Sequence, residues 1–292
     1  MTRILLIGGA GYLGRELNRG LEDSEHEVVV TSRSGSDSAV DITDAGTIAT
    51  ALRNIRPDVV INLAAVGVDA SRRDHNVLRS MINVNAVGPS LLAREIGRAG
   101  SDVRLIHFAS SREALEGPVD EGRSTYSVTK SCGTAIIAEA IGAGRLNGVT
   151  LRLHSVYGGS QPNTRLVGGV IDAALRGKQF MVREPHAALD FVHIDDVVGA
   201  VRSAVRCTNF GSRALDIGTG VSTDVITAAR AVYAAVGFVP SAVLEDQTWG
   251  DVDVAYAIDC DVLPASEALG WTAQIPLERG VIQAVKEYQC VG

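Results

Sequence analysis

Residues 4–14 have the sequence Ile4-Leu5-Leu6-Ile7-Gly8-Gly9-Ala10-Gly11-Tyr12-Leu13-Gly14, and this stretch decides the fold class. Its apolar start predicts a buried strand, and the pattern from Tyr12 onward predicts a helix. Gly8 allows the sharp turn between them, Gly11 lets a pyrophosphate approach the backbone, and Gly14 lets the helix pack closely on the strand. The helix N-terminus offers free N–H groups and its positive dipole end to phosphate. We therefore predict a dinucleotide site here, with Tyr12 and Leu13 among its contacts.

Apolar runs rich in β-branched residues recur along the first half of the chain and alternate with segments of helical period. The runs are 3–7, 27–31, 58–63, 103–108 and 149–153, and the helical segments include 45–55, 81–98 and 127–140. This βαβ alternation predicts the α/β class, as a doubly wound parallel sheet (Rossmann) with a smaller, mixed C-terminal substrate lobe. We expect residues 1–156 to form the dinucleotide-binding domain, with later segments at about 189–235 returning to it. Residues 157–188 and 236–292 are expected to form the substrate lobe, with Trp249 and Trp271 in its core.

The composition favours a soluble enzyme with a small-molecule partner over a protein that binds nucleic acid or a membrane. The chain has 292 residues, 46% of them hydrophobic, and a formal net charge of −7. Its Lys and Arg are scattered and form no basic stripe for nucleic acid. No apolar stretch reaches the length of a membrane span, and Met1 leads into the first strand without a cleavable leader, so we expect a cytoplasmic location. The four cysteines form no CxxC pair, which favours free thiols and no metal site.

The end of the second strand carries the residues that select the nicotinamide cofactor. A carboxylate about twenty residues past the glycines would bind the ribose 2′-hydroxyl of NAD. The sequence has Thr31-Ser32-Arg33 instead, and a guanidinium binds a 2′-phosphate, so NADP(H) is predicted, with Ser32 and Arg33 as contacts. Asp41 and Ile42 are placed to meet the adenine. The run Leu63-Ala64-Ala65 ends a later strand, where small side chains let the cofactor pass close to the backbone.

The run Tyr126-Ser127-Val128-Thr129-Lys130 places a phenol and an ammonium one helical turn apart on the same face. An ammonium beside a phenol favours phenolate, so we expect the pKa of Tyr126 to fall from its usual value of about 10. Such a tyrosine exchanges a proton with a carbonyl or alcohol oxygen while hydride moves to or from a nicotinamide. Lys130 is also expected to bond the nicotinamide ribose. Ser110 and Ser111 close the preceding strand, and Ser111 is the favoured hydroxyl for holding the reacting oxygen.

Taken together, these residues resemble the extended short-chain dehydrogenase/reductases that act on nucleotide-linked sugars. The resemblance runs through nearly the whole chain. Beyond the glycine turn, its parts are Asp41-Ile42-Thr43-Asp44, Asn62-Leu63-Ala64-Ala65, Asn85, Phe108-Ala109-Ser110-Ser111, Tyr126 with Lys130, 151–158, 190–196 and Leu269-Gly270-Trp271. It implies catalytic roles for Ser111, Tyr126 and Lys130, and a homodimer built from the helices around 81–98 and 127–140.

Further residues are predicted beside the cofactor and the substrate. Ser110, His154 and Val156 are expected at the cofactor, although His154 either touches the nicotinamide amide or simply packs. Leu189 stands where many family members have an arginine for the nucleotide diphosphate, which leaves Arg165 or Arg183 as a substitute.

The segment around Ser111 also departs from the family pattern. Ser111 and Tyr126 are fifteen residues apart, a short interval that suggests a trimmed loop over the sugar. Arg112 and Glu113 stand where related 4,6-dehydratases carry an acid and a base, and only Glu113 fits its role; it is otherwise a solvated loop carboxylate. The expected substrate contacts are Ser111, Arg112, Glu113 and Arg165.

The pattern looks most like the nucleoside-diphosphate-4-keto-6-deoxyhexose 4-ketoreductases of deoxysugar biosynthesis, in which NADPH reduces the C4 ketone. Two other enzyme classes stay open, namely a sugar 4-epimerase and a 4,6-dehydratase that uses Glu113. A regulatory subunit that binds NADP without turnover is the alternative outside enzymes, and the intact pair of Tyr126 and Lys130 argues against it.

Overall fold

The computed structural model describes residues 1–22, 25–33, 39–67, 75–100, 102–114, 125–182, 185–208, 210, 214–238 and 256–291. Its main sheet has six parallel strands in the order β2-β1-β3-β4-β5-β8. These strands are β1 (Thr2–Ile7), β2 (His26–Thr31), β3 (Val59–Asn62), β4 (Arg104–Ser110), β5 (Asn147–Leu153) and β8 (Ala214–Ile217). The chain starts inside the sheet and builds outward on both sides of β1, so the predicted doubly wound fold is confirmed.

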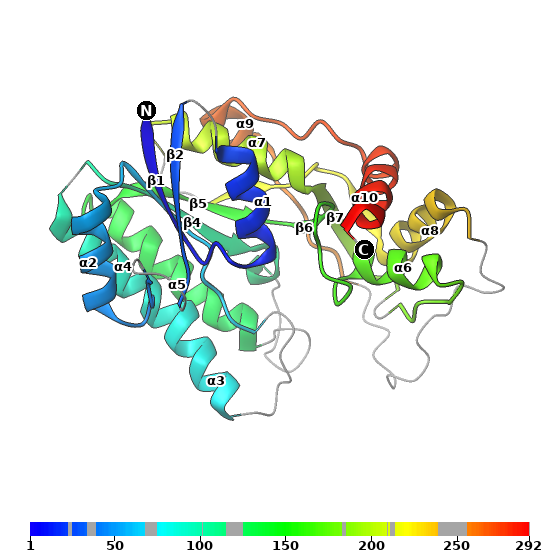
Figure 1. Ribbon diagram of the computed structural model, residues 1–292, viewed down its shortest axis with the longest axis horizontal. Coiled ribbons are helices and arrows are strands. Elements are labelled where there is room, and N and C mark those ends of the chain that lie inside the picture. The colour runs from blue at the N-terminus through cyan, green and yellow to red at the C-terminus, as the bar shows by residue number, and fades with distance from the viewer. Residues whose placement is uncertain are drawn as a thin grey trace.

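Helices cover both faces of this sheet, as Figure 1 shows. One face carries α2 (Ala45–Ile55), α4 (Gly88–Ala99) and α5 (Thr125–Gly142), and the other carries α1 (Tyr12–Leu21) and α7 (Ile194–Arg206). Ile4 and Leu6 of β1 point into the core under α1 and α7, whereas Leu5 and Ile7 point into the core under α2 and α4. Because both faces are covered, this strand is a continuous apolar run.

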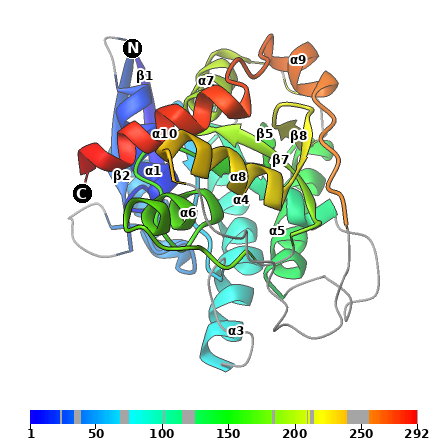
Figure 2. The same cartoon turned by 90° about the vertical axis from the view of Figure 1, so that its right-hand side faces the viewer.

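A smaller part of the molecule lies beyond the carboxyl end of β5. Its three-stranded sheet is mixed, because β7 (Ala188–His193) runs parallel to β6 (Ser155–Tyr157) and antiparallel to β9 (Ser222–Asp224). Three helices share its core and lie side by side in Figure 2, namely α6 (Leu166–Leu175), α8 (Val225–Val236) and α10 (Leu277–Val291). The predicted smaller, mixed lobe is therefore present, while its exact division at residues 156, 188 and 236 stays a prediction.

The C-terminal segment does not belong wholly to that smaller part. Two residues of helix α9 (Leu263–Leu269), Ala265 and Leu269, are buried together with Trp271 in the core formed by β1, β4, β5 and α7. The prediction that Trp271 lies in the core of the small lobe is therefore wrong, because the chain returns to the main sheet before α10. Trp249 lies outside the described residues. Within the described ranges, we find no helix with both the length and the apolar character needed to cross a membrane.

Candidate active site

The turn between β1 and α1 has the conformation that its glycines predict. The N–H groups of Gly8 and Gly9 both donate to the Thr31 carbonyl oxygen at 3.1 Å, which ties the turn to β2. Gly8 has a φ of +81°, and a Cβ there would lie 2.9 Å from the backbone N of Ala64. A Cβ on Gly14 would lie 2.4 Å from the Cα of Gly9. Gly8 and Gly14 are therefore required by the packing of the turn itself.

Gly11 has no such requirement. It is the N-cap of α1, with extended backbone angles, and a Cβ there would meet only the Gly8 carbonyl oxygen, at 3.6 Å. Space is therefore open above the N-terminus of a ten-residue helix whose first N–H groups face outward. This open approach fits a bound pyrophosphate, since phosphate is held by such N–H groups and by the helix dipole. The residues present thus fit the predicted dinucleotide.

The cofactor contacts predicted at and after the end of β2 differ in their exposure to solvent. Arg33 is exposed and Ser32 is half-buried, just past the end of the strand. Asp41 accepts from the N–H of Thr43 at 2.9 Å and from its hydroxyl at 2.7 Å. These two bonds lower the pKa of Asp41, and the nearby Arg33 charge adds to the effect. Ile42 is buried in the core under α2 and α4, so its side chain packs inside the protein.

The other predicted cofactor contacts follow the carboxyl ends of the next strands. Ala64 donates its N–H to the Asn62 side chain at 3.1 Å and lies against Gly8, while Leu63 is half-buried and Ala65 exposed. Val156 is buried in the core, as is the ring of His154, whose Nε2 lies 3.8 Å from the Asp216 carboxylate.

Helix α5 positions Tyr126 in its first turn and Lys130 one turn later. The Lys130 side chain is buried, and its Nζ donates to the carbonyl oxygen of Phe108 in β4. Burial lowers the pKa of Lys130 to about 8, against the opposing charge of Glu113. Burial raises the pKa of Tyr126 to about 12, and Glu113 adds to this increase. The expected fall of the Tyr126 pKa is therefore wrong for this structure, because the lysine bonds a backbone carbonyl and desolvation dominates at the phenol.

The two serines at the end of β4 differ in their surroundings. Ser110 ends the strand, whereas Ser111 begins the short 3₁₀ helix η2 (Ser111–Ala114) and is only 6% exposed. Glu113 Oε1 accepts the backbone N–H of Ser110 at 2.9 Å, so its carboxylate points back toward the strand end. Burial raises the pKa of Glu113, in part offset by the charge of Lys130. Arg112 is exposed, and its positive charge lowers the pKa of Tyr126 against these increases.

Arg165 is the predicted diphosphate contact that the structure brings near the site. It is the N-cap residue of α6, and its guanidinium carbon lies 5.7 Å from the centre of the Tyr12 ring. The Arg165 charge also lowers the pKa of Tyr126, so the guanidinium lies between the glycine turn after β1 and the start of α5. Leu189 packs in the core of the smaller lobe, and Arg183 lies outside the described residues.

Sequence reasoning missed how the loop after β6 is attached to the cofactor helix. The Tyr12 hydroxyl donates to the Gly158 carbonyl at 2.6 Å, and Glu16 accepts the N–H of Ser160 at 2.8 Å. Glu287 of α10 accepts the N–H of Gly159 at 2.6 Å. We call this the loop clasp. One available signal was Glu16, a carboxylate on the apolar face of α1 that is only 3% exposed.

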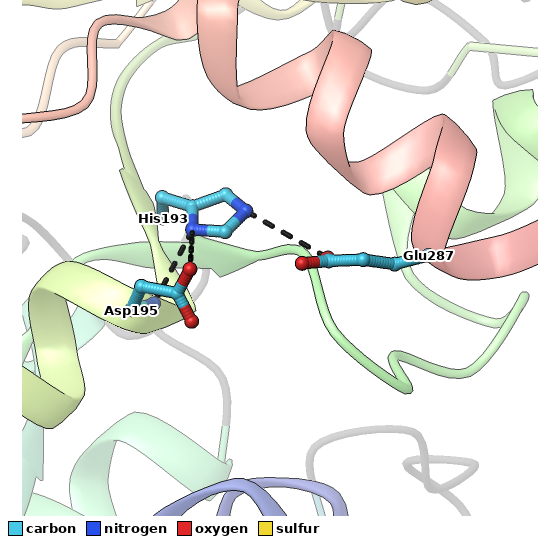
Figure 3. A group of neighbouring side chains, drawn as sticks. All are labelled: His193, Asp195 and Glu287. Carbon is cyan, nitrogen blue, oxygen red and sulfur yellow. Dashed lines mark hydrogen bonds and ion pairs between the residues drawn. The ribbon is translucent and has the colours of Figure 1, made fainter. Parts of the chain in front are cut away.

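A second cluster lies beside the loop clasp. His193 is fully buried between Asp195 and Glu287, as Figure 3 shows. Its Nδ1 accepts the N–H of Asp195 at 3.3 Å and so caps α7, while its Nε2 lies 3.9 Å from the Glu287 carboxylate. The three side chains are close enough to share a cation. However, the Gln283 amide nitrogen donates to both carboxylates, at 2.6 and 2.9 Å, and so already fills the position between them.

Asn85 lies in the π-helix η1 (Asn83–Val87), between α3 (His75–Ile82) and α4. Its side chain accepts the N–H of Val66 at 2.9 Å and donates to the Val66 carbonyl at 2.8 Å and to the Thr129 hydroxyl at 3.0 Å. It therefore fastens the chain after β3 to α5. The resemblance implies that Asn85 anchors a water at a helix kink, and that role stays a prediction beside these direct bonds.

Comparison with known proteins places this geometry in a family. The model of the NAD dependent epimerase/dehydratase family matches residues 4–218. The chain belongs to this family. The matched range runs from β1 through the end of β8, so it includes the glycine turn, Tyr126 and Lys130. The predicted resemblance is thereby confirmed.

Individual relatives carry several names. This family member is 26% identical over 313 residues to a dTDP-6-deoxy-L-talose 4-dehydrogenase (NAD(P)(+)) of Kitasatospora kifunensis, covering 96% of this chain and 93% of the relative. It is 38% identical over 148 residues to a "Probable dTDP-4,6-dihydroxy-2-methyloxan-3-one 4-ketoreductase" of Streptomyces antibioticus, covering 48% of each chain. A UDP-glucose 4-epimerase of Thermotoga maritima, solved with UDP-glucose, shares the fold with a TM-score of 0.82 and 24% identity, covering 99% of both chains.

Proposed function

We propose that the protein reduces the C4 ketone of a nucleoside-diphosphate-4-keto-6-deoxy sugar with NADPH. The observation that carries this proposal is the placement of two chemical functions at one edge of the sheet. The open turn at Gly11 follows β1, and Tyr126 with Lys130 lies beside the end of β4. Carboxyl ends of neighbouring parallel strands form the ligand edge of such sheets, so a dinucleotide on the turn extends toward the phenol.

Each side chain of the site has a different role in this reaction. Bound NADPH supplies the hydride. Tyr126 keeps its proton at neutral pH, because its pKa is raised, and donates it to the oxygen that gains charge as the ketone is reduced. Lys130 adds a buried positive charge next to the site, and a serine hydroxyl at the end of β4 holds the same oxygen. Arg165 supplies the charge that binds the substrate diphosphate in this proposal, which its position 5.7 Å from the Tyr12 ring supports.

NADPH is preferred over NADH in this proposal because of Arg33. The guanidinium is exposed just past β2, and residues 31–33 include no carboxylate that would repel a 2′-phosphate. Replacing Arg33 with Ala is expected to raise the KM for NADPH about tenfold or more and to leave the KM for NADH nearly unchanged. Arg53→Ala, in the exposed last turn of α2, is the matched control. Equal changes for the two cofactors would rule out this role of Arg33.

The epimerase alternative is supported by the name of the full-length neighbour from Thermotoga maritima. The dehydratase alternative needs Glu113 as a base that faces the sugar. Glu113 instead accepts the N–H of Ser110, and Arg112 occupies the position of the acid. These two observations favour reduction or epimerisation over elimination. A regulatory subunit without turnover would leave the buried Lys130 without a chemical role.

Assays of the purified protein with two sugar nucleotides distinguish the reductase from the three alternatives. Reduction predicts that one NADPH is oxidised for each dTDP-4-keto-6-deoxyglucose consumed, which the absorbance of the reduced nicotinamide reports. Tyr126→Phe is expected to keep NADPH affinity and to lower kcat by about 100-fold or more. dTDP-glucose is the second substrate, because it still has a C4 hydroxyl that an epimerase inverts and a C6 hydroxyl that a dehydratase eliminates; its conversion without net oxidation of NADPH would instead identify one of these two enzymes. If neither sugar changes in the presence of either cofactor, the regulatory subunit is supported.

We also propose that the protein is a cytoplasmic homodimer. Apolar side chains are exposed along α3, η1 and α5, at Leu78, Ile82, Val87 and Val128. An apolar surface shared by several helices fits a self-complementary contact. Light scattering on the wild type and on an Ile82→Asp variant tests this. The proposal requires a dimer that the substitution dissociates, and a wild-type monomer would contradict it.

A further inference from the structure

A buried polar pair lies in the row of the main sheet at which β1 and β3 end. Ile7, Asn62 and His107 are register partners in β1, β3 and β4, and Thr150 of β5 is the next residue of this row. The Ile7 side chain packs under α2 and α4, and register partners in parallel strands point to the same face. The side chains of Asn62 and His107 are both buried there. Gly8 follows Ile7 directly, so the pair lies one row before the glycine turn.

The Asn62 amide is hydrogen-bonded at both of its polar atoms. Its Oδ1 accepts the N–H of Ala64 at 3.1 Å, and its Nδ2 lies 3.2 Å from Nδ1 of His107. An amide nitrogen only donates, so Nδ1 of His107 is the acceptor and the ring proton is on Nε2. The opposite orientation of the amide would place its NH2 group against the Ala64 N–H, donor against donor. Among the described residues Nε2 has no hydrogen-bond partner, so no second contact competes with this choice of tautomer.

The surroundings of His107 keep its ring neutral. The ring is buried, and Lys130 of α5 donates to the carbonyl oxygen of the next residue, Phe108. Burial and, to a smaller extent, the Lys130 charge hold the pKa of His107 well below its usual range. A second cation beside the buried ammonium would be costly because neither charge is solvated. His107 therefore keeps an unprotonated Nδ1 for the Asn62 amide at neutral pH.

Ala64 connects this pair to the glycine turn. Strand β3 ends at Asn62, so the Ala64 N–H lies beyond the strand, and the Asn62 side chain supplies its acceptor. The N–H of Leu63 donates to the Ile7 carbonyl oxygen at 2.9 Å. A Cβ on Gly8 would lie 2.9 Å from the Ala64 N and 3.1 Å from the Leu63 carbonyl carbon. The backbone of Leu63 and Ala64 is therefore the surface on which the turn rests.

We propose that His107 is a positioning residue for the dinucleotide: by accepting the Asn62 amide, it fixes the backbone of Leu63 and Ala64 against the glycine turn. This inference rests on the dinucleotide site of the proposed function. His107 acts through Asn62 and does not itself contact the cofactor. Its loss should therefore weaken NADPH binding and leave the chemical step nearly unchanged.

Two amide substitutions separate this role from simple packing, because both remove the imidazole ring. His107→Asn presents an oxygen near the position of Nδ1, whereas the longer side chain of His107→Gln carries its amide past that position. We expect His107→Asn to bind NADPH within about threefold of the wild type, and His107→Gln to bind it about tenfold more weakly. The value of kcat should stay within about threefold in both variants. Equal NADPH affinities of the two variants would overturn the proposal.

Thr150→Val is the matched control for these affinities. The Thr150 hydroxyl is buried in the same row of the sheet as His107, and the described part of the chain offers it no hydrogen-bond partner. Valine keeps the shape of threonine, so NADPH affinity should match the wild type. A loss as large as that of His107→Gln would show that any change in this row weakens binding, which would overturn the specific role of His107.

Nuclear magnetic resonance of the cofactor-free protein tests the inference without NADPH. In wild-type protein labelled with ¹⁵N at the histidine rings, the signals absent from His107→Asn identify His107. The proposal requires an unprotonated Nδ1 and a protonated Nε2 at pH 7. A proton on Nδ1 would overturn it. Hydrogen exchange of the Ala64 amide should be about tenfold faster in His107→Gln than in the wild type and in His107→Asn. Equal exchange in all three proteins would also overturn it.

These readouts distinguish a failure of the positioning role from a failure of the proposed function. A wild-type protein that binds no NADPH would refute the dinucleotide site, and with it the proposed reduction, whatever the spectra show. Tight NADPH binding by a protein with the proton on Nδ1 of His107 would refute the positioning role alone.

Discussion

Gly11 and Gly14 lie three residues apart in the same turn, yet the structure predicts opposite consequences for their replacement by alanine. At Gly14 the new Cβ would lie 2.4 Å from both the Cα and the carbonyl oxygen of Gly9, which are backbone atoms that cannot rotate away. Overpacking of this kind costs about 1–3 kcal/mol, and a clash with fixed backbone atoms falls at the upper end of that range, about 3 kcal/mol. The better helix propensity of alanine returns about 1 kcal/mol. We expect a net loss of about 2 kcal/mol, which lowers Tm by roughly 4–8 °C.

At Gly11 the new Cβ has room, since its nearest neighbour is the Gly8 carbonyl oxygen at 3.6 Å. An alanine N-cap costs about 1 kcal/mol or less, so Tm should change little. The methyl group would occupy the approach to the helix N-terminus, and a lost hydrogen bond to a charged group costs about 1.5–3 kcal/mol. We therefore expect NADPH to bind about 10- to 100-fold more weakly.

Both variants are measured by thermal unfolding and by the fluorescence of bound NADPH. Gly142→Ala is the control, since a Cβ at the end of α5 meets nothing within 4 Å. The reasoning is refuted if Gly11→Ala binds NADPH as tightly as the wild type, or if Gly14→Ala unfolds at the wild-type temperature. The first result would show that no pyrophosphate approaches this turn.

Three further predictions follow from contacts around the site. Asn85→Ala leaves the Val66 N–H and carbonyl without their side-chain partner, so it should lower the free energy of unfolding by about 3 kcal/mol. Urea titration measures this change. The control is Asn147→Ala, on an exposed residue, which should change the free energy of unfolding little. Asp196→Ala removes the carboxylate that accepts the N–H groups of Gln274 and Ile275. Hydrogen exchange of these two amides should therefore accelerate about tenfold or more. Unchanged exchange rates at both amides would contradict the prediction. Burial lowers the pKa of Lys130 to about 8, so its ammonium group is lost as the pH rises through that value. We therefore expect kcat/KM for reduction to fall above pH 8. A kcat/KM that stays constant up to about pH 10 would exclude a role for the Lys130 charge.

The sequence was sufficient for features that depend on local patterns. The apolar run at 4–7 predicted a buried strand, and the three glycines predicted the turn, because strand periodicity and backbone freedom are properties of neighbouring residues. The spacing of Tyr126 and Lys130 placed them in one helix for the same reason. These features predicted the elements that carry the candidate site, namely β1, α1 and α5.

Other features depend on contacts between distant parts of the chain. Ser160 and Glu16 are 144 positions apart in sequence, so nothing near either residue indicated the loop clasp. The raised pKa of Tyr126 follows from its burial and from Glu113 on another element, neither of which a YxxxK spacing contains. Trp271 was assigned to the wrong core because the return of the chain to the main sheet at α9 leaves no periodic signal in so short a helix.

The hydrogen bond from the Gly159 N–H to Glu287 limits the changes that can be made at the C-terminus. Glu287 is four residues from the end of α10, so the last helical turn reaches back to the same short segment that Tyr12 and Glu16 hold. Shortening the C-terminus or fusing a rigid partner there would thus disturb cofactor affinity from a distance, and affinity tags belong at the other end of the chain.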